Sequence, residues 1–247
     1  VAYVTGLGYC EFWQNGEKVG EDVLVPNQTN YGKRPSLPLE NIPLDDNFRE
    51  YRVMYLAYDV SDKLTEGPNV LGAILGNGFY NPAKYWAGSY GTPRFIMQLH
   101  ISYDDGSEET VISDETWKCS ESPILMDMVF YGEHYDARLE QAGWCSSGFK
   151  DYGWENAVLK KAPEGKMIAH TACPDRVMEV LKPVKTEKTG EGNYRIDFGQ
   201  EISGWVHLKN MNGEAGRKIE IRYIHRVPSG ENSYIMKGSG DESYHAR

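Results

Sequence analysis

The sequence predicts an all-β protein made of two antiparallel β-sandwich domains, the second of which is incomplete. Short segments that alternate polar and apolar residues follow one another along the chain, separated by turn residues. Glycine occurs 26 times and tyrosine 17 times in 247 residues, a composition typical of β-rich chains with many turns. No segment keeps a helical period beyond about three turns. We therefore expect antiparallel sheets that pack face to face.

The first expected strands precede residue 65. Residues 2–5 have the composition of a strand, and residues 8–14 alternate before Asn15-Gly16, a strong hairpin signal. Residues 51–60 alternate again. Residues 61–64 are expected to form one helical turn before the Gly67-Pro68 break.

The next strands are expected to complete the first sandwich. Residues 70–75 form an apolar run typical of a buried strand. Residues 95–103 alternate, and the turn at residues 104–106 leads into a return strand at 109–112. Core and surface positions should alternate across these strands, at Phe12, Trp13, Leu56, Tyr58, Ile74, Leu75, Phe95, Met97, Leu99 and Val111.

A domain boundary is expected between residues 158 and 175, where the chain is polar and broken by proline and glycine. We place it after residue 165, giving domains 1–165 and 166–247. The strongest strand patterns of the second domain lie at residues 194–198, 204–208 and 218–223, and they end before a full sandwich could close. Both ends of the chain lie in strand-like sequence, so we expect a fragment of a longer protein.

Composition excludes several classes of protein. The net charge is −10, the pI is about 5.1 and no basic stripe exists, which argues against nucleic acid as a partner. No apolar segment has the length of a membrane span, and no signal peptide opens the chain, so the compartment stays open between cytoplasm and bacterial periplasm. The four cysteines and six histidines show no zinc-binding spacing, and free thiols are expected.

The charged residues predict no catalytic site. A glycosidase normally needs two facing carboxylates. The adjacent acids are expected to be solvated turn residues, at Asp45-Asp46, Asp104-Asp105 and Glu108-Glu109. A denser cluster is interpreted as a structural ion-pair network, formed by Glu133, Asp136, Arg138 and Glu140. We expect this chain alone to be inactive.

The segment that follows the apolar run 70–75 is the candidate binding site. Asn77 lies between two glycines, which allow a sharp turn that presents its amide. Nearby aromatic residues could cover the apolar side of a sugar ring, namely Tyr80, Tyr85, Trp86 and Tyr90. The alternative is a glycine-rich turn whose aromatic side chains belong to the core. Calcium binds oxygen ligands, which the Asn77 side chain, the Pro82 carbonyl and Asn30 could supply.

The order of these motifs resembles the N-terminal region of bacterial α-L-rhamnosidases, family seventy-eight of the glycoside hydrolases. The matching segments cover nearly the whole chain, at residues 6–9, 15–20, 26, 29–31, 58–62, 75–80, 113–118, 132–138 and 197–206. The resemblance implies a jelly-roll first domain and a concanavalin-like second β-sandwich. It also implies that the catalytic acids lie in a downstream helical barrel of the same polypeptide, outside this chain.

In some members of that family the first domain is a rhamnose-binding module that uses calcium. Asn77 and Pro82 match its site, and Asn30 stands where many relatives carry an acid, which lowers the calcium affinity expected here. Trp86 is a candidate stacking ring. The complete enzyme is implied to hydrolyse terminal α-L-rhamnose with inversion, from carbohydrates that contain L-rhamnose. Two alternatives stay open: a purely structural support for the barrel, and a stand-alone carbohydrate-binding or adhesion module.

Overall fold

The computed structural model describes residues 1–32, 50–82, 88–129, 132–209, 213–223, 225–226, 233–234 and 241–245. It is 39% strand and 3% helix, which confirms the all-β prediction. The described helical turns are η1 (Ser61–Lys63), at the place expected, and η2 (Ala137–Leu139). Within the described residues, no helix is both long and apolar enough to cross a membrane.

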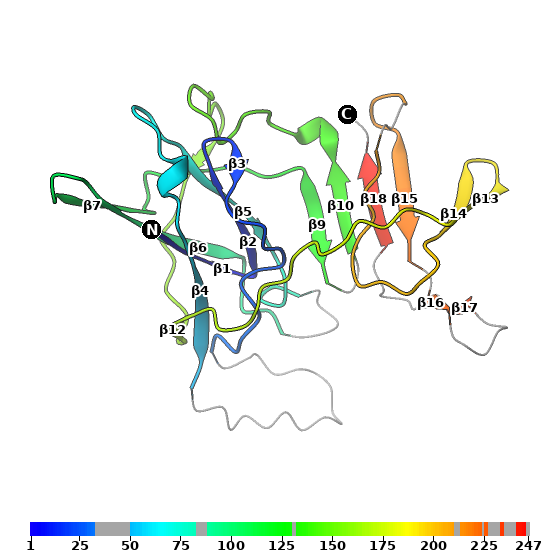
Figure 1. Ribbon diagram of the computed structural model, residues 1–247, viewed down its shortest axis with the longest axis horizontal. Helices are drawn as coiled ribbons and strands as arrows, with labels where there is room; N and C mark the ends of the chain where they lie inside the picture. The colour runs from blue at the N-terminus through cyan, green and yellow to red at the C-terminus, as the bar shows by residue number, and fades with distance from the viewer. Residues whose placement is uncertain are drawn as a thin grey trace.

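The first sandwich packs a five-stranded sheet against a three-stranded sheet (Figure 1). The five-stranded sheet has the order β12-β4-β1-β6-β7, with bounds Lys166–Ala169, Arg52–Tyr58, Ala2–Leu7, Arg94–Ser102 and Glu108–Ile112. The three-stranded sheet has the order β3-β2-β5, with bounds Glu17–Lys18, Tyr9–Gln14 and Leu71–Gly76. A short pair joins β8 (Lys118–Cys119) to β11 (Glu155–Asn156).

The main hydrophobic core lies between these two sheets. Val4, Leu56 and Met97 from the larger sheet meet Phe12 from the smaller one. In β6, Met97 and Leu99 are buried while Ile96, Gln98 and His100 are exposed, so the predicted alternation is confirmed. Alternation places one set of side chains in the core because successive residues of a strand point to opposite faces.

A smaller hydrophobic cluster lies where β1 ends and β4 begins. It contains Leu7, Tyr31, Val53 and Tyr80, with Tyr90 packed against it. Two loops therefore cover this end of the five-stranded sheet: the loop before residue 33 and the loop after β5. The second of these is the candidate binding segment.

Strand pairing continues past the boundary expected after residue 165. The strand β12 pairs in parallel with β4, from Lys166 opposite Arg52 to Ala169 opposite Tyr55. Farther on, Val23 forms a bridge with Asp175, and Asp22 accepts a hydrogen bond from Arg176. The contacts of the first unit thus extend to about residue 176, because the polar stretch before β12 is a connection within the sheet.

The described residues after 180 contribute strands to three sheets. The hairpin of β13 (Lys185–Gly190) and β14 (Asn193–Asp197) stands alone. A mixed sheet joins β15 (Lys218–Arg222) and β18 (Asp241–His245) to β10 (Gly132–Asp136) and β9 (Ile124–Met128), side by side in Figure 1. The remaining pair is β16 (His225–Arg226) with β17 (Ser233–Tyr234). The two expected domains therefore share a sheet.

One expected strand is wrong. Residues 204–208 form no strand, and Trp205 is 53% exposed. The alternating pattern is present, but in the described part of the chain no neighbouring strand pairs with this segment. The strands expected at 194–198 and 218–223 are confirmed as β14 and β15.

Candidate functional site

The candidate loop begins where β5 ends at Gly76, and close backbone packing shapes it. A Cβ on Gly8 would lie 2.2 Å from the Gly76 carbonyl oxygen, so the chain at Gly8 passes directly against the end of β5. Gly78 has a φ of 48°, in the left-handed region that favours glycine. The loop then turns back, and the Asn81 backbone N–H donates to the Asn77 carbonyl oxygen over 3.1 Å.

Asn77 is half-buried and held by Asp127, a residue of β9. The Asn77 backbone N–H donates to Asp127 Oδ2 over 2.7 Å. The Asn77 side-chain Nδ2 donates to Asp127 Oδ1 over 2.5 Å, with a longer contact of 3.5 Å to the Asp127 carbonyl oxygen. Both carboxylate oxygens therefore accept hydrogen bonds from the same residue.

A chain of side-chain hydrogen bonds continues from Asn77 across the loop. Asn81 Nδ2 donates to Asn77 Oδ1 over 2.7 Å, and Ser89 Oγ donates to Asn81 Oδ1 over 2.7 Å. The Gly91 backbone N–H in turn donates to Ser89 Oγ over 3.0 Å. These contacts connect the start of the loop to the segment that leads back towards β6.

The aromatic rings near this loop belong to the core where the structure describes them. Tyr31 and Tyr80 are each 2% exposed, and their ring centroids lie 5.1 Å apart in an edge-to-face arrangement. Tyr90 stacks on Tyr80 at 5.5 Å, and its hydroxyl donates to the Gly32 carbonyl oxygen over 3.2 Å. For Tyr80 the core alternative is therefore confirmed, whereas Tyr90 is partly buried and packs against the cluster. Tyr85 and Trp86, the predicted stacking ring, lie outside the described residues.

Asn30 and Pro82 lie on the two loops that these tyrosines join. Asn30 is half-buried, and its carbonyl oxygen accepts a hydrogen bond from the Arg52 backbone N–H over 3.0 Å. Its neighbour Tyr31 contacts Tyr80, which precedes the buried Pro82 by two positions. The loops that carry Asn30, Asn77 and Pro82 are thus packed together, and the assignment of these residues to a site stays a prediction.

Burial keeps the tyrosines of this region protonated. Burial raises the pKa of Tyr31 to about 12. The pKa of Tyr9 is also raised, first by burial and then by the charges of Asp175 and Asp127. The Tyr9 ring lies against Gly78, where an added Cβ would be 3.3 Å from the ring. Near neutral pH these phenols are uncharged.

The other charged residues match the structural interpretation in part: one ion pair of the expected network is present, and Glu108-Glu109 lies in the strand β7 and not in a turn. Arg138 pairs with Asp136 through two hydrogen bonds, of 2.8 Å from Nε to Oδ1 and 2.6 Å from Nη2 to Oδ2. Asp105 accepts from Ser107 in an exposed turn, as expected of a solvated acid. The pair Asp45-Asp46 lies outside the described residues. Within the described part of the chain, no three His, Cys, Asp or Glu side chains gather as a metal site would require.

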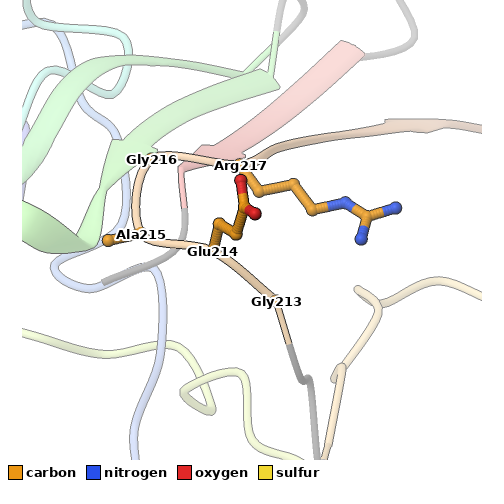
Figure 2. A pocket seen from close by; sticks show the side chains of 5 residues that line it. All are labelled: Gly213, Glu214, Ala215, Gly216 and Arg217. Atoms are coloured by element: carbon orange, nitrogen blue, oxygen red, sulfur yellow. The ribbon is translucent and has the colours of Figure 1, made fainter.

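An open hollow of about 720 Å³ lies next to β15 and is shown in Figure 2. It is lined by the consecutive residues Gly213 to Arg217, which form a single turn. The Arg217 backbone N–H donates to the Glu214 carbonyl oxygen over 3.1 Å. Because one short loop forms the whole hollow and no predicted site residue lines it, we do not assign it a ligand.

Asp127 is the site residue that sequence reasoning missed. It lies 50 positions beyond Asn77, and nothing in the local pattern connects the two. The available signal was the single acid within the apolar sequence Ile-Leu-Met-Asp-Met of β9. An acid inside such a strand must find hydrogen-bond donors, because burying an unpaired charge is costly.

Two family models match this chain. The α-L-rhamnosidase N-terminal domain matches residues 1–42 and 42–179, and the bacterial α-L-rhamnosidase concanavalin-like domain matches residues 187–247. The first match ends just beyond the contacts of Arg176. The second begins within β13.

Similar proteins carry the same description. An α-L-rhamnosidase of Formosa agariphila is 35% identical over 98% of this chain and 26% of its own length. One of Streptomyces avermitilis is 31% identical over 99% of this chain and 24% of its own length. The chain thus spans about a quarter of these relatives.

Solved structures agree with the fold. The α-L-rhamnosidase structure from Dictyoglumus thermophilum has a TM-score of 0.84 and 34% identity, covering 100% of this chain and 26% of that one. A crystal structure of the Streptomyces avermitilis α-L-rhamnosidase complexed with L-rhamnose has a TM-score of 0.84 and 30% identity, covering 99% and 22%. This chain therefore belongs to the α-L-rhamnosidase family, of which it carries the N-terminal domain and a segment of the concanavalin-like domain.

Proposed function

We propose that this chain is the accessory β-sandwich region of an inverting α-L-rhamnosidase, and that its Asn77 loop binds terminal L-rhamnose. The complete enzyme would hydrolyse terminal α-L-rhamnose from glycosides or polysaccharides. Its catalytic acids would lie in a helical barrel of the same polypeptide. Family membership supports the enzyme class, and the relative crystallised with L-rhamnose supports the sugar.

The observation that carries the binding role is the arrangement of the Asn77 amide. Asp127 and Asn81 hold this side chain from both sides, so its orientation is set before any ligand arrives. A pre-oriented polar group at a loop binds a sugar hydroxyl with little additional loss of entropy. The packed tyrosines beneath the loop keep it rigid.

Calcium is part of the proposal. Asn77, Pro82 and Asn30 would hold the ion through amide and backbone oxygens, the ligand type that calcium prefers. Bound calcium would coordinate vicinal hydroxyls of the sugar directly. Asn30 would contribute a neutral ligand to the ion. The nearby negative charge belongs to Asp127, which accepts a hydrogen bond from Asn77. The donors fit calcium, with an affinity below that of a site containing a carboxylate ligand.

The second candidate function is structural support for the barrel without sugar binding. The burial of Tyr80 favours it, because a ring in the core cannot stack on a ligand, and the partly buried Tyr90 ring already stacks on Tyr80. Calorimetric titration with L-rhamnose, with and without calcium, separates the two. Equal binding with and without calcium would support the sugar site and contradict the calcium site. No binding at millimolar sugar in either condition would contradict the sugar site and favour structural support.

The Asn77→Ala variant tests the residue itself. Loss of a fixed oxygen should cost about 1–3 kcal/mol, or roughly ten- to a hundredfold in affinity for L-rhamnose. Asn156→Ala is the matched control, because Asn156 lies on β11 and its side-chain amide bonds to Lys118 and to the Glu115 carbonyl oxygen. Trp86→Ala in the same titration tests the predicted stacking ring. An Asn77→Ala protein that binds as tightly as the control would exclude Asn77 from the site.

Activity is tested separately. The described adjacent acids lie in exposed turns or strands, and none forms the facing pair that hydrolysis requires. The 247-residue chain should therefore release no product from an aryl α-L-rhamnoside. Turnover that persists after purification from a host lacking rhamnosidase would contradict this.

A further inference from the structure

We infer that Asp127 is a positioning residue that sets which atom of the Asn77 amide faces a bound ligand. This inference rests on the proposed function of the Asn77 loop and adds a residue from a different sheet to it. Asp127 belongs to β9, in the mixed sheet with β10, β18 and β15. Asn77 follows β5 of the three-stranded sheet.

The contact between the two residues is close, and Gly76 leaves room for it. Asp127 Oδ2 accepts the Asn77 backbone N–H over 2.7 Å, and an added Cβ on Gly76 would lie 2.9 Å from that same oxygen. A side chain at position 76 would push the carboxylate away. The glycine before Asn77 therefore has a second purpose besides the turn, since it admits Asp127.

The chemistry of the carboxylate decides the orientation of the amide. Both Asp127 oxygens accept hydrogen bonds from Asn77. A carboxylate only accepts, whereas an amide has one donating and one accepting end. Turning the Asn77 amide over would place its Oδ1 against Asp127 Oδ1, and two acceptors at 2.5 Å repel each other. Nδ2 must face Asp127.

The hydrogen bonds at the other end of the chain run in the same direction. Ser89 Oγ accepts from the Gly91 backbone N–H and donates its own hydrogen to Asn81 Oδ1. Asn81 then presents Nδ2 to Asn77 Oδ1. The carboxylate at one end and the backbone N–H at the other thus agree on one orientation for both amides.

This orientation selects the ligand chemistry. Asn77 Oδ1 has two lone pairs, and Asn81 uses one of them. The second can accept a hydroxyl hydrogen or coordinate a hard cation, and it would repel an anion. The site is therefore suited to a polyhydroxylated, uncharged ligand, and the charge of Asp127 next to Asn77 increases the polarity of that oxygen.

The test replaces one oxygen of Asp127 by an amide nitrogen. In Asp127→Asn the remaining oxygen can still accept the Asn77 N–H, so the fold is retained, but the new NH₂ donates towards Asn77 and allows its amide to turn. Affinity for L-rhamnose should fall roughly tenfold or more. The Asn77 side-chain amide resonances should shift in the nitrogen–proton NMR spectrum. The control is Asp114→Asn, an exposed acid that likewise accepts one backbone N–H and one side-chain hydrogen.

A second variant guards against loss of folding. Asn81→Asp replaces the donor that faces Asn77 Oδ1 by an acceptor, so it opposes the same orientation from the other side. It should lower L-rhamnose affinity in the same way, and it carries the test if Asp127→Asn unfolds. Wild-type affinity in a folded Asp127→Asn or Asn81→Asp protein would overturn the inference.

The outcome for Asp127 can be separated from that of the proposed function. If the wild-type chain binds no rhamnose, the proposed function fails, and the NMR measurement alone decides on Asp127. Protected Asn77 side-chain protons in the wild type that become exchangeable in Asp127→Asn would support the positioning role. Identical shifts and exchange in both proteins would overturn it.

Discussion

Asp22 is a buried carboxylate whose cationic partner lies 154 positions later in the chain. Its side chain is 9% exposed, and Oδ1 lies 2.9 Å from Nε of Arg176, which is half exposed. The Tyr58 hydroxyl is a more distant donor at 3.5 Å. Because Asp22 is the buried member, Arg176 offsets much of the cost of removing that charge from water.

Removal of Arg176 should destabilise the protein. In Arg176→Ala the Asp22 carboxylate stays buried without its ion-pair partner, and the free energy of unfolding should fall by about 1–3 kcal/mol. Lys185→Ala is the control, since its pair with Glu187 is exposed on both sides and should be worth less than about 1 kcal/mol. Urea denaturation of both variants provides the measurement. Equal losses would show that burial of Asp22 is unimportant.

The cysteines should divide into two reactive and two protected thiols. Cys119 and Cys173 are exposed, whereas Cys10 and Cys145 are buried. Burial raises the pKa of Cys10 to about 12, so this thiol stays protonated and unreactive in the folded protein. A colorimetric thiol reagent near pH 8 should label Cys119 and Cys173 in the native state, and all four cysteines in denaturant.

The same shift predicts a direction for stability at high pH. The folded state keeps the proton on Cys10, whereas the unfolded thiol ionises above its ordinary pKa of 9.0. The contribution of Cys10 to stability is therefore complete below pH 9 and is lost as the pH rises towards 12. The Cys10→Ser protein should lose less stability than the wild type as the pH rises from 9 towards 12. An identical pH dependence in both proteins would contradict the assignment.

Sequence patterns predicted the turn at Asn77 but not the residue that holds its side chain. Two glycines around an amide are a local signal, and the structure shows a tight turn there. Asp127 and Asn77 meet through tertiary packing, which no local spacing encodes. The same limit applies to Tyr80 and Tyr90, whose exposure depends on the face towards which the loop folds.

Strand prediction succeeded where alternation was strong and partners were adjacent. The hairpin of β6 and β7 is confirmed because a short turn fixes both its partner and its register. The parallel pairing of β12 with β4 was missed because the two strands lie more than a hundred residues apart. Alternation identifies a strand but does not identify its neighbour.

Gly165 controls the approach of β12 to the sheet. A Cβ at this position would lie 2.8 Å from the Arg52 carbonyl carbon and 2.9 Å from the Arg52 nitrogen. Backbone atoms cannot move aside as a flexible side chain can, so Gly165→Ala should cost about 1–3 kcal/mol through overpacking. Denaturant unfolding, with stability extrapolated to water, measures this loss.

Gly204→Ala is the matched control for Gly165→Ala. An added Cβ at Gly204 meets nothing within 4 Å, and the change should lie within about 0.5 kcal/mol of the wild type. A Gly165→Ala protein as stable as Gly204→Ala would mean that β12 lies farther from β4 than the structure shows.

Strand pairing joins the regions covered by the two family models. Within the first region, Arg176 and Asp175 attach its end to residues 22 and 23. The parallel pair of β10 with β18 then continues the β9–β10 hairpin into the second region. Composition predicts a polar connection near residue 165. It does not predict which sheet the strands before and after that connection join, because this depends on pairing between distant strands.

The extent of the first folding unit can be tested by shortening the chain. Both hydrophobic clusters are built from residues before 118, so a chain of residues 1–179 should fold cooperatively. A chain of residues 1–165 keeps those clusters but lacks β12 and Arg176, which leaves one edge of β4 unpaired and Asp22 without its cation. It should melt about 5–10 °C lower, as expected for a loss of a few kcal/mol in a domain of this size.

Both shortened chains lack β13 to β18, so the difference between them reports only on residues 166–179. Circular dichroism should show the same β spectrum in each at low temperature, and calorimetry should give their melting temperatures. Equal melting temperatures would place the boundary at residue 165 and make β12 dispensable. A lower melting temperature for residues 1–165 would show that residues 166–179 stabilise the first unit. If Arg176→Ala combined with Gly165→Ala lowers the melting temperature of the longer chain by the same amount, the stabilisation comes from the Arg176–Asp22 ion pair and the pairing of β12 with β4.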